Sequence, residues 1–110
     1  MILGLDWDDT ITTYSKGISQ LCKGNTVIII TLNPCVTVDM AEEVLKCRVA
    51  KVIIMPDTMF DTTVEDVGIG AWKASVCKAE NVNVMIDDLQ SVCDACTAIG
   101  IPSIQVHLKD

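Results

Sequence analysis

The sequence predicts an α/β fold, in which a five-stranded parallel sheet is flanked by helices in a three-layer, Rossmann-like arrangement. Five apolar segments alternate along the 110 residues with segments whose apolar residues recur at helical spacing. Residues 26–31 are continuously apolar and β-branched, which is typical of a strand covered on both faces of a parallel sheet. Strands that alternate with helices in this way run parallel, with right-handed crossovers. A chain of this length forms one domain, and we assign residues 1–110 to it.

The individual elements follow from local patterning and from residues that end helices and strands. Gly24 and Gly100 stand where a helix C-cap is expected, and Thr37 can cap the helix that follows it. Pro34 and Pro56 come just after the second and third strands and prevent their extension. The expected strands are residues 2–5, 26–31, 49–55, 81–86 and 103–107, and the expected helices are residues 12–23, 37–47, 71–80 and 89–99.

Three of these segments carry more detailed expectations. In the helix of residues 37–47, the expected buried stripe consists of Met40, Ala41, Val44 and Leu45. Apolar and polar residues alternate in residues 103–107, which predicts a half-buried strand at a sheet edge with a surface histidine, His107. Residues 56–70 predict a loop, and loops of this length are often functional.

Composition and charge restrict the class of protein. Half of the residues are hydrophobic, yet no apolar run reaches the length of a membrane span. Met1 leads directly into the first strand without the features of a secretory signal, so we expect a cytoplasmic protein without a membrane partner. The net charge of −7 disfavours an extended nucleic-acid ligand. The six cysteines indicate reduced core thiols, with a redox or metal role for Cys93-Asp-Ala-Cys96 as the alternative.

Carboxylates gather where two of the strands end. Asp6, Asp8 and Asp9 follow the first strand, and Asp87-Asp88 follow the fourth. The carboxyl ends of parallel strands lie at one edge of the sheet, where ligands bind in such folds. Carboxylates this close raise one another's pKa unless a cation neutralises them. Hard divalent cations prefer oxygen ligands, so the pattern predicts a Mg²⁺ site at this edge.

The segment Asp6-Trp7-Asp8-Asp9-Thr10 resembles the first motif of the haloacid dehalogenase (HAD) superfamily of phosphotransferases. Thr31 at the end of the second strand is similar to the second motif, and Asp87-Asp88 to the fourth. The third motif is a lysine before the fourth strand, for which Lys73 and Lys78 are candidates. We favour Lys73 because it lies in the first turn of the expected helix, and Lys78 is about 7.5 Å further along the axis.

The resemblance implies a strand order of 3-2-1-4-5 and a Mg²⁺-dependent phosphatase that acts on phosphate monoesters. Asp6 would be the nucleophile that forms an aspartyl-phosphate, and Asp8 the general acid and base. The implied phosphate-binding residues are Thr10, Thr31, Asn33 and Lys73, and the implied metal ligands are Asp6, Asp8 through its backbone carbonyl, Asp87 and Asp88. Asp9 replaces the glycine common at its position in the superfamily.

No segment is long enough to form the cap domain that many members of the superfamily carry, so the enzyme is expected to be capless. A neighbouring subunit or a macromolecular substrate could then cover the site, with the loop of residues 56–70 and its Phe60 as the contact surface. We favour a homo-oligomer that acts on a small phosphorylated metabolite or nucleotide.

Two alternative functions stay open. One is a catalytically silent HAD fold that serves as a binding module. The other is a response-regulator receiver domain in which Asp57 accepts the phosphoryl group, although the fourth strand ends in Asp87 where a receiver domain has threonine.

Overall fold

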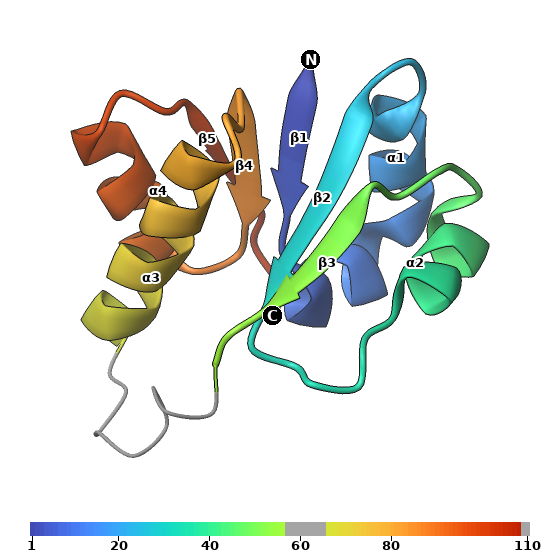
Figure 1. The fold of residues 1–110 in the computed structure, drawn as a ribbon, viewed down its shortest axis with the longest axis horizontal. Coiled ribbons are helices and arrows are strands. Elements are labelled where there is room, and N and C mark those ends of the chain that lie inside the picture. The colour runs from blue at the N-terminus through green and yellow to red at the C-terminus, as the bar shows by residue number, and fades with distance from the viewer. Residues whose placement is uncertain (57–65, 109–110) are drawn as a thin grey trace.

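The computed structural model describes residues 1–56 and 66–108 of the chain, and Figure 1 shows their arrangement. The strands are β1 (Ile2–Leu5), β2 (Thr26–Thr31), β3 (Lys51–Ile54), β4 (Val84–Asp87) and β5 (Ser103–Gln105). The helices are α1 (Thr12–Cys22), α2 (Val38–Leu45), α3 (Asp66–Ala79) and α4 (Gln90–Ala98), with a helical turn η1 (Trp7–Ile11) between β1 and α1.

The sheet has five parallel strands in the order β3-β2-β1-β4-β5, which confirms the expected fold class and strand order. The central strand β1 pairs with β2 through Leu3 and Val27 and with β4 through Leu3 and Val84. In Figure 1 all the strands run downward, so their carboxyl ends share the lower edge of the sheet. Strand β5 lies at one sheet edge, as predicted, and His107 is exposed. The burial expected from the alternating pattern is wrong at Ile104, which is 50% exposed, whereas the polar Ser103 and Gln105 are partly buried.

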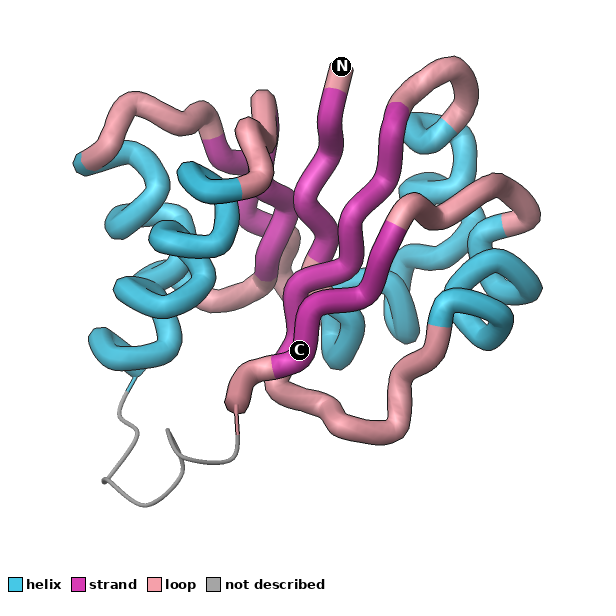
Figure 2. The backbone as a smooth tube through the Cα atoms, viewed as in Figure 1, coloured by secondary structure: helices cyan, strands magenta, loops and turns pink. Residues whose placement is uncertain are grey.

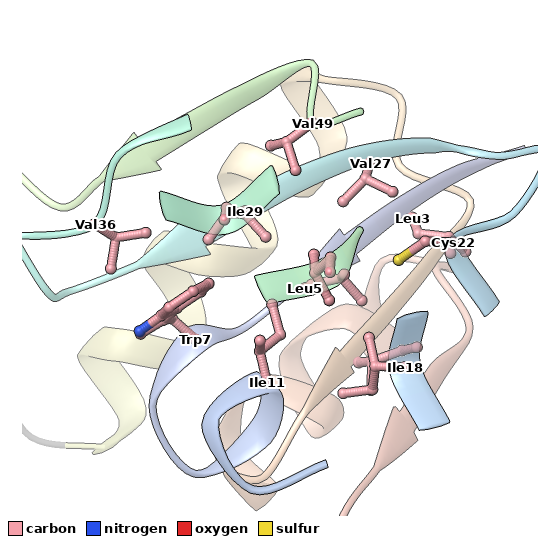
Figure 3. Packing of buried hydrophobic residues seen from close by; sticks show 13 residues of the cluster. Leu3, Leu5, Trp7, Ile11, Ile18, Cys22, Val27, Ile29, Val36 and Val49 are labelled. Atoms are coloured by element: carbon pink, nitrogen blue, oxygen red, sulfur yellow. The ribbon is translucent and has the colours of Figure 1, made fainter. Parts of the chain in front are cut away.

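Helices cover both faces of the sheet, as Figure 2 shows, and each face has its own hydrophobic core. On one face, α1 and α2 pack against residues such as Leu5 and Ile29, in the cluster drawn in Figure 3. On the other face, α3 and α4 pack against residues such as Ile30 and Met85. Leu5, Ile29, Ile30 and Met85 are each 0% exposed, so the middle of the sheet is closed to water on both sides. The central strands therefore hold their carboxyl ends on a rigid base.

Helix α3 begins at Asp66, so the expected loop of residues 56–70 is wrong for residues 66–70. Two glycines in the first turns, Gly68 and Gly70, disfavour a helix, and the sequence therefore predicted a later start for α3. Gly70 is needed because a Cβ atom there would lie 2.5 Å from the backbone oxygen of Ser91 in α4. The glycine lets α3 and α4 approach closely. Asp57, Phe60 and Asp61 of the expected loop lie outside the described residues.

Helix α2 buries a narrower stripe than its pattern predicts. Thr37 caps the helix as expected, since its side chain accepts a hydrogen bond from the Met40 amide at 3.1 Å. Ala41 and Leu45 are buried, but Met40 and Val44 are 40% and 39% exposed. The four-residue buried stripe is therefore wrong at these two positions, because the helix meets the core through one row of side chains only.

None of the six cysteines forms a disulfide. Four are buried, as expected for core cysteines, whereas Cys47 is partly buried and Cys35 is exposed; the buried ones are Cys22, Cys77, Cys93 and Cys96. Cys93 and Cys96 of the Cys-x-x-Cys sequence both lie on α4, where they are buried and not joined by a disulfide. Among the helices of the described residues, none combines the length and the apolar character that crossing a membrane requires.

Candidate functional site

Asp6 stands directly after β1, with its side chain buried at the carboxyl edge of the sheet. Its amide donates to the Ile86 carbonyl at 3.0 Å, which continues the bonding between β1 and β4 by one residue. The residue is 6% exposed and has an extended backbone. The next side chain, Trp7, turns into the core below the sheet edge (Figure 3), and this apolar contact anchors the acidic turn. Local structure thus fixes the position of the Asp6 carboxylate.

Both oxygens of that carboxylate have partners. The Lys73 Nζ atom lies 2.6 Å from Asp6 Oδ1, and the Thr10 hydroxyl donates to Asp6 Oδ2 at 3.0 Å. The Thr10 side chain is fully buried and does not line the cavity of the site. Its hydroxyl therefore orients Asp6, whereas the resemblance implies a phosphate-binding role for Thr10.

Lys73 links two strand ends. It lies 2.9 Å from Asp87 Oδ2 as well as 2.6 Å from Asp6, and it is 3% exposed. Burial alone would lower the pKa of Lys73, but the adjacent carboxylates of Asp6 and Asp87 outweigh this effect and hold the pKa above its ordinary value. The ammonium group is therefore charged at neutral pH and compensates part of the negative charge of the site.

The structure places Lys73 in the acidic cluster and leaves Lys78 exposed at another surface. The choice between the two lysines agrees with the sequence analysis, but its premise was wrong. Because α3 begins at Asp66, Lys73 is seven residues into the helix, about 10 Å along the axis. The lysine that contacts the carboxylates therefore comes from the middle of α3 and not from its first turn.

Three carboxylates form a candidate cation site. Asp6, Asp87 and Asp88 each offer an oxygen within 4.8 Å of the others. Burial, followed by the proximity of Asp6, raises the pKa of Asp88 to about 7. Burial also raises the pKa of Asp87, against the opposing effect of Lys73. Raised carboxyl pKa values in a cluster of hard oxygen donors fit a divalent cation such as Mg²⁺, which would replace the bound protons.

Hydrogen bonds from neighbouring elements hold this pair of acids. Asp87 Oδ1 accepts from the Leu89 amide at 3.0 Å, and the Asp88 carbonyl accepts from Gln105 Nε2 at 3.3 Å. The sequence did not single out Gln105. Its place opposite Asp87 depends on the register between β4 and β5, which no local pattern reveals.

Asp8 and Asp9 are exposed and take no part in the three-carboxylate cluster. Asp8 Oδ1 lies 3.5 Å from Asn33 Nδ2, while the Asn33 amide donates to the buried Thr31 hydroxyl at 3.0 Å. Asp9 has a left-handed backbone with φ of 63°, which glycine adopts freely and aspartate tolerates. The turn therefore points Asp8 toward the loop after β2.

A cavity of about 270 Å³ brings most of these groups together. Its lining consists of Asp6, Asp8, Asp9, Thr31, Leu32, Ile69, Lys73, Asp87, Asp88 and Leu89. Two other cavities of the described residues are larger: one of about 600 Å³ lies at the opposite edge of the sheet beside Val27, Glu42 and Arg48, and one of about 300 Å³ lies beside Lys78. We assign function to the smallest of the three because the paired acids and the buried lysine are there.

Some expectations stand apart from this cavity. Asn33 does not line it and contacts it only through Asp8 and Thr31. Asp57, the acceptor of the receiver-domain alternative, lies outside the described residues. The apolar lining residues Leu32, Ile69 and Leu89 were missed, since isolated apolar residues near strand ends carry no recognisable signal.

Comparison with known proteins adds no assignment to this geometry. No family model matches the chain, and no curated protein or solved structure is significantly similar to it.

Proposed function

We propose that the chain is a Mg²⁺-dependent phosphatase of the HAD type, which hydrolyses phosphate monoesters through an aspartyl-phosphate on Asp6. One observation carries this proposal: a buried, doubly held carboxylate, a buried lysine and two further carboxylates meet at one edge of a parallel sheet. A carboxylate that attacks phosphorus needs fixed orientation and neutralisation of the anionic substrate, and this set of residues can supply both.

In the first half-reaction, the Asp6 carboxylate attacks phosphorus and forms an oxygen–phosphorus bond, while the bond to the leaving oxygen breaks. Thr10 and Lys73 hold Asp6 in place for this step. The exposed carboxyl group of Asp8 gives its proton to the leaving oxygen. Thr31 and Lys73, which both line the cavity, would donate to the phosphoryl oxygens.

In the second half-reaction, a water molecule attacks phosphorus and releases Asp6 and inorganic phosphate. Asp8 takes the proton from that water and so returns to its starting state. Bound Mg²⁺ would be held by Asp6, the Asp8 carbonyl, Asp87 and Asp88, and would neutralise negative charge on the ligands and the phosphoryl group.

The test is hydrolysis of a panel of phosphate monoesters with Mg²⁺. Asp6→Asn and treatment with EDTA should each abolish turnover, while circular dichroism shows an intact fold. Asp8→Asn should retain the nucleophile and accumulate a phosphoenzyme, detected by mass spectrometry as one added phosphoryl group. The matched control is Asp9→Asn, which lies in the same turn and should remain active within a few-fold. Full activity of Asp6→Asn would refute the proposal.

The same assay separates the silent binding module from the enzyme. A silent module would bind inorganic phosphate and Mg²⁺ without hydrolysing any ester.

The favoured homo-oligomer, in which a neighbouring subunit covers the open site, is tested separately. Sedimentation at micromolar concentration should show the oligomer, and an active monomer would contradict this part of the proposal.

A further inference from the structure

Three apolar side chains, which together we call the apolar wall, are among the lining residues of the acidic cavity, and they come from three different elements. Leu32 follows β2, Ile69 lies on α3 and Leu89 follows β4. Each is partly exposed to solvent, so together they offer a solvent-accessible apolar surface in the same cavity as the carboxylates. Ile69 and Leu89 also pack against the core of the α3 and α4 face, whereas Leu32 belongs to neither core cluster.

The other lining residues are unsuited to additional anionic groups. Among the described residues of the lining, five carboxylates face a single ammonium group, that of Lys73. With all of them ionised the net charge is −4, and a bound divalent cation reduces it to −2. One phosphoryl group can use that cation and Lys73, but a second phosphate would meet Asp8 or Asp9 without a cation of its own.

Hydroxyl-rich leaving groups find hydrogen-bond acceptors in the carboxylates but few other polar partners. Apart from the acids, Lys73 and Thr31, the described lining contains only the three apolar side chains. The exposed Asp8 and Asp9 carboxylates can accept hydrogen bonds from some hydroxyl groups, but the described lining adds no amide, imidazole or guanidinium side chain to them. Hydroxyl groups placed against an apolar wall would lose their hydrogen bonds to water without replacement. The cavity of about 270 Å³ accommodates a phosphoryl group and a small adjoining group.

We infer that the cavity selects monoesters that carry one phosphoryl group on an uncharged, apolar leaving group, in preference to polyol phosphates and bisphosphates. The inference rests on the proposed function, because it assigns the substrate class of the same site. Leu32, Ile69 and Leu89 are the specificity-determining residues, since they are the apolar side chains of the described lining.

The first experiment compares benzyl phosphate, ribose 5-phosphate and fructose 1,6-bisphosphate with Mg²⁺. All three release an alcohol, so differences in kcat/KM report recognition more than leaving-group reactivity. Benzyl phosphate should be preferred by about tenfold or more, the lower bound for apolar discrimination by a pocket. Leu32→Ala should reduce that preference about tenfold, while Leu21→Ala, at an exposed apolar residue of α1, should leave it unchanged.

The second experiment measures binding without chemistry. Benzylphosphonate and methylphosphonate cannot be hydrolysed at the ester position, and NMR titration gives their affinities for the Mg²⁺-loaded protein. Tighter binding of benzylphosphonate that is lost in Leu32→Ala supports the apolar wall, even if no ester is hydrolysed. Hydrolysis of all three esters at similar rates would overturn the inference and leave the phosphatase proposal intact. Failure of both hydrolysis and phosphonate binding would overturn both.

Discussion

The buried lysine of the site allows a sharp test by substitution of Lys73 with methionine. The Lys73 side chain is 4% exposed, and its partners Asp6 and Asp87 are 9% and 1% exposed. Removing one partner from such a buried ion pair leaves uncompensated charge and costs about 3–5 kcal/mol. A domain of this size is stable by about 5–15 kcal/mol, so Lys73→Met should lose about a fifth or more of the free energy of unfolding.

The loss should depend on pH and on Mg²⁺. In the wild type, burial raises the pKa of Asp87 and Lys73 opposes that rise, so removing Lys73 raises this pKa further. The folded variant then holds a proton that the unfolded chain gives up, and its stability increases as pH falls toward the ordinary carboxyl pKa. The penalty should therefore be smaller at pH 5 than at pH 8. Added Mg²⁺ should restore part of the stability at pH 8, because it supplies positive charge to the same carboxylates.

Urea unfolding followed by circular dichroism, with EDTA at pH 5 and pH 8, measures the effect. The matched control is Lys78→Met, an exposed lysine of the same helix, which should change stability by less than about 0.5 kcal/mol. The double variant Lys73→Met/Asp87→Asn should be more stable than Lys73→Met alone, since it removes one of the stranded charges. A loss below about 1 kcal/mol for Lys73→Met at pH 8 would refute this account of the cluster.

Three further predictions concern the backbone and the cation site. Gly70→Ala should lower the free energy of unfolding by about 1–3 kcal/mol in urea, because its Cβ atom would meet the Ser91 backbone. Gly68→Ala has open space around its Cβ atom and should raise the free energy of unfolding by up to about 1 kcal/mol. Equal effects of the two variants would contradict the close helix contact. Because Asp9 has a left-handed φ, Asp9→Gly should be neutral or stabilising, and Asp9→Val should lower stability by about 1–2 kcal/mol. A Val variant with a higher melting temperature than the Gly variant would contradict the left-handed conformation. The pKa of Asp88 is raised to about 7, so between about pH 4 and 7 the folded chain holds a proton that the unfolded chain loses. Without metal, the urea midpoint should therefore fall as the pH rises through this range, and Mg²⁺ or Asp88→Asn should flatten the slope. A flat wild-type profile in EDTA would exclude the pKa shift.

The sequence was most informative where one local signal sufficed. The β-branched run of β2 and the acids after β1 and β4 predicted the sheet and the edge that carries the carboxylates, because both patterns express burial directly. Lys73 lies in the acidic cluster, although the helix start from which it was chosen was wrong, since two glycines disfavour a helix unless a close neighbour requires them.

Other features depend on contacts between distant segments. Leu32 and Ile69 share a cavity wall only because α3 packs beside the end of β2, and nothing at either position indicates this locally. The exposure of Met40 and Val44 likewise reflects how little of α2 reaches the core. Thr10 was expected to face the phosphate, but its burial turns the hydroxyl toward Asp6.

The central position of β1 has a consequence for the order in which the chain acquires its site. One side of β1 pairs with β2, about 24 residues away, and the other waits for β4, about 81 residues away. During synthesis the β1-α1-β2-α2-β3 half is complete first, with one edge of β1 still open. The bond from the Asp6 amide to Ile86, and both contacts of Lys73, form only when the second half docks on that edge. In pulsed hydrogen exchange during refolding, the amides of β2 should therefore gain protection before that of Asp6, and assembly of the acidic cluster would coincide with closure of the sheet.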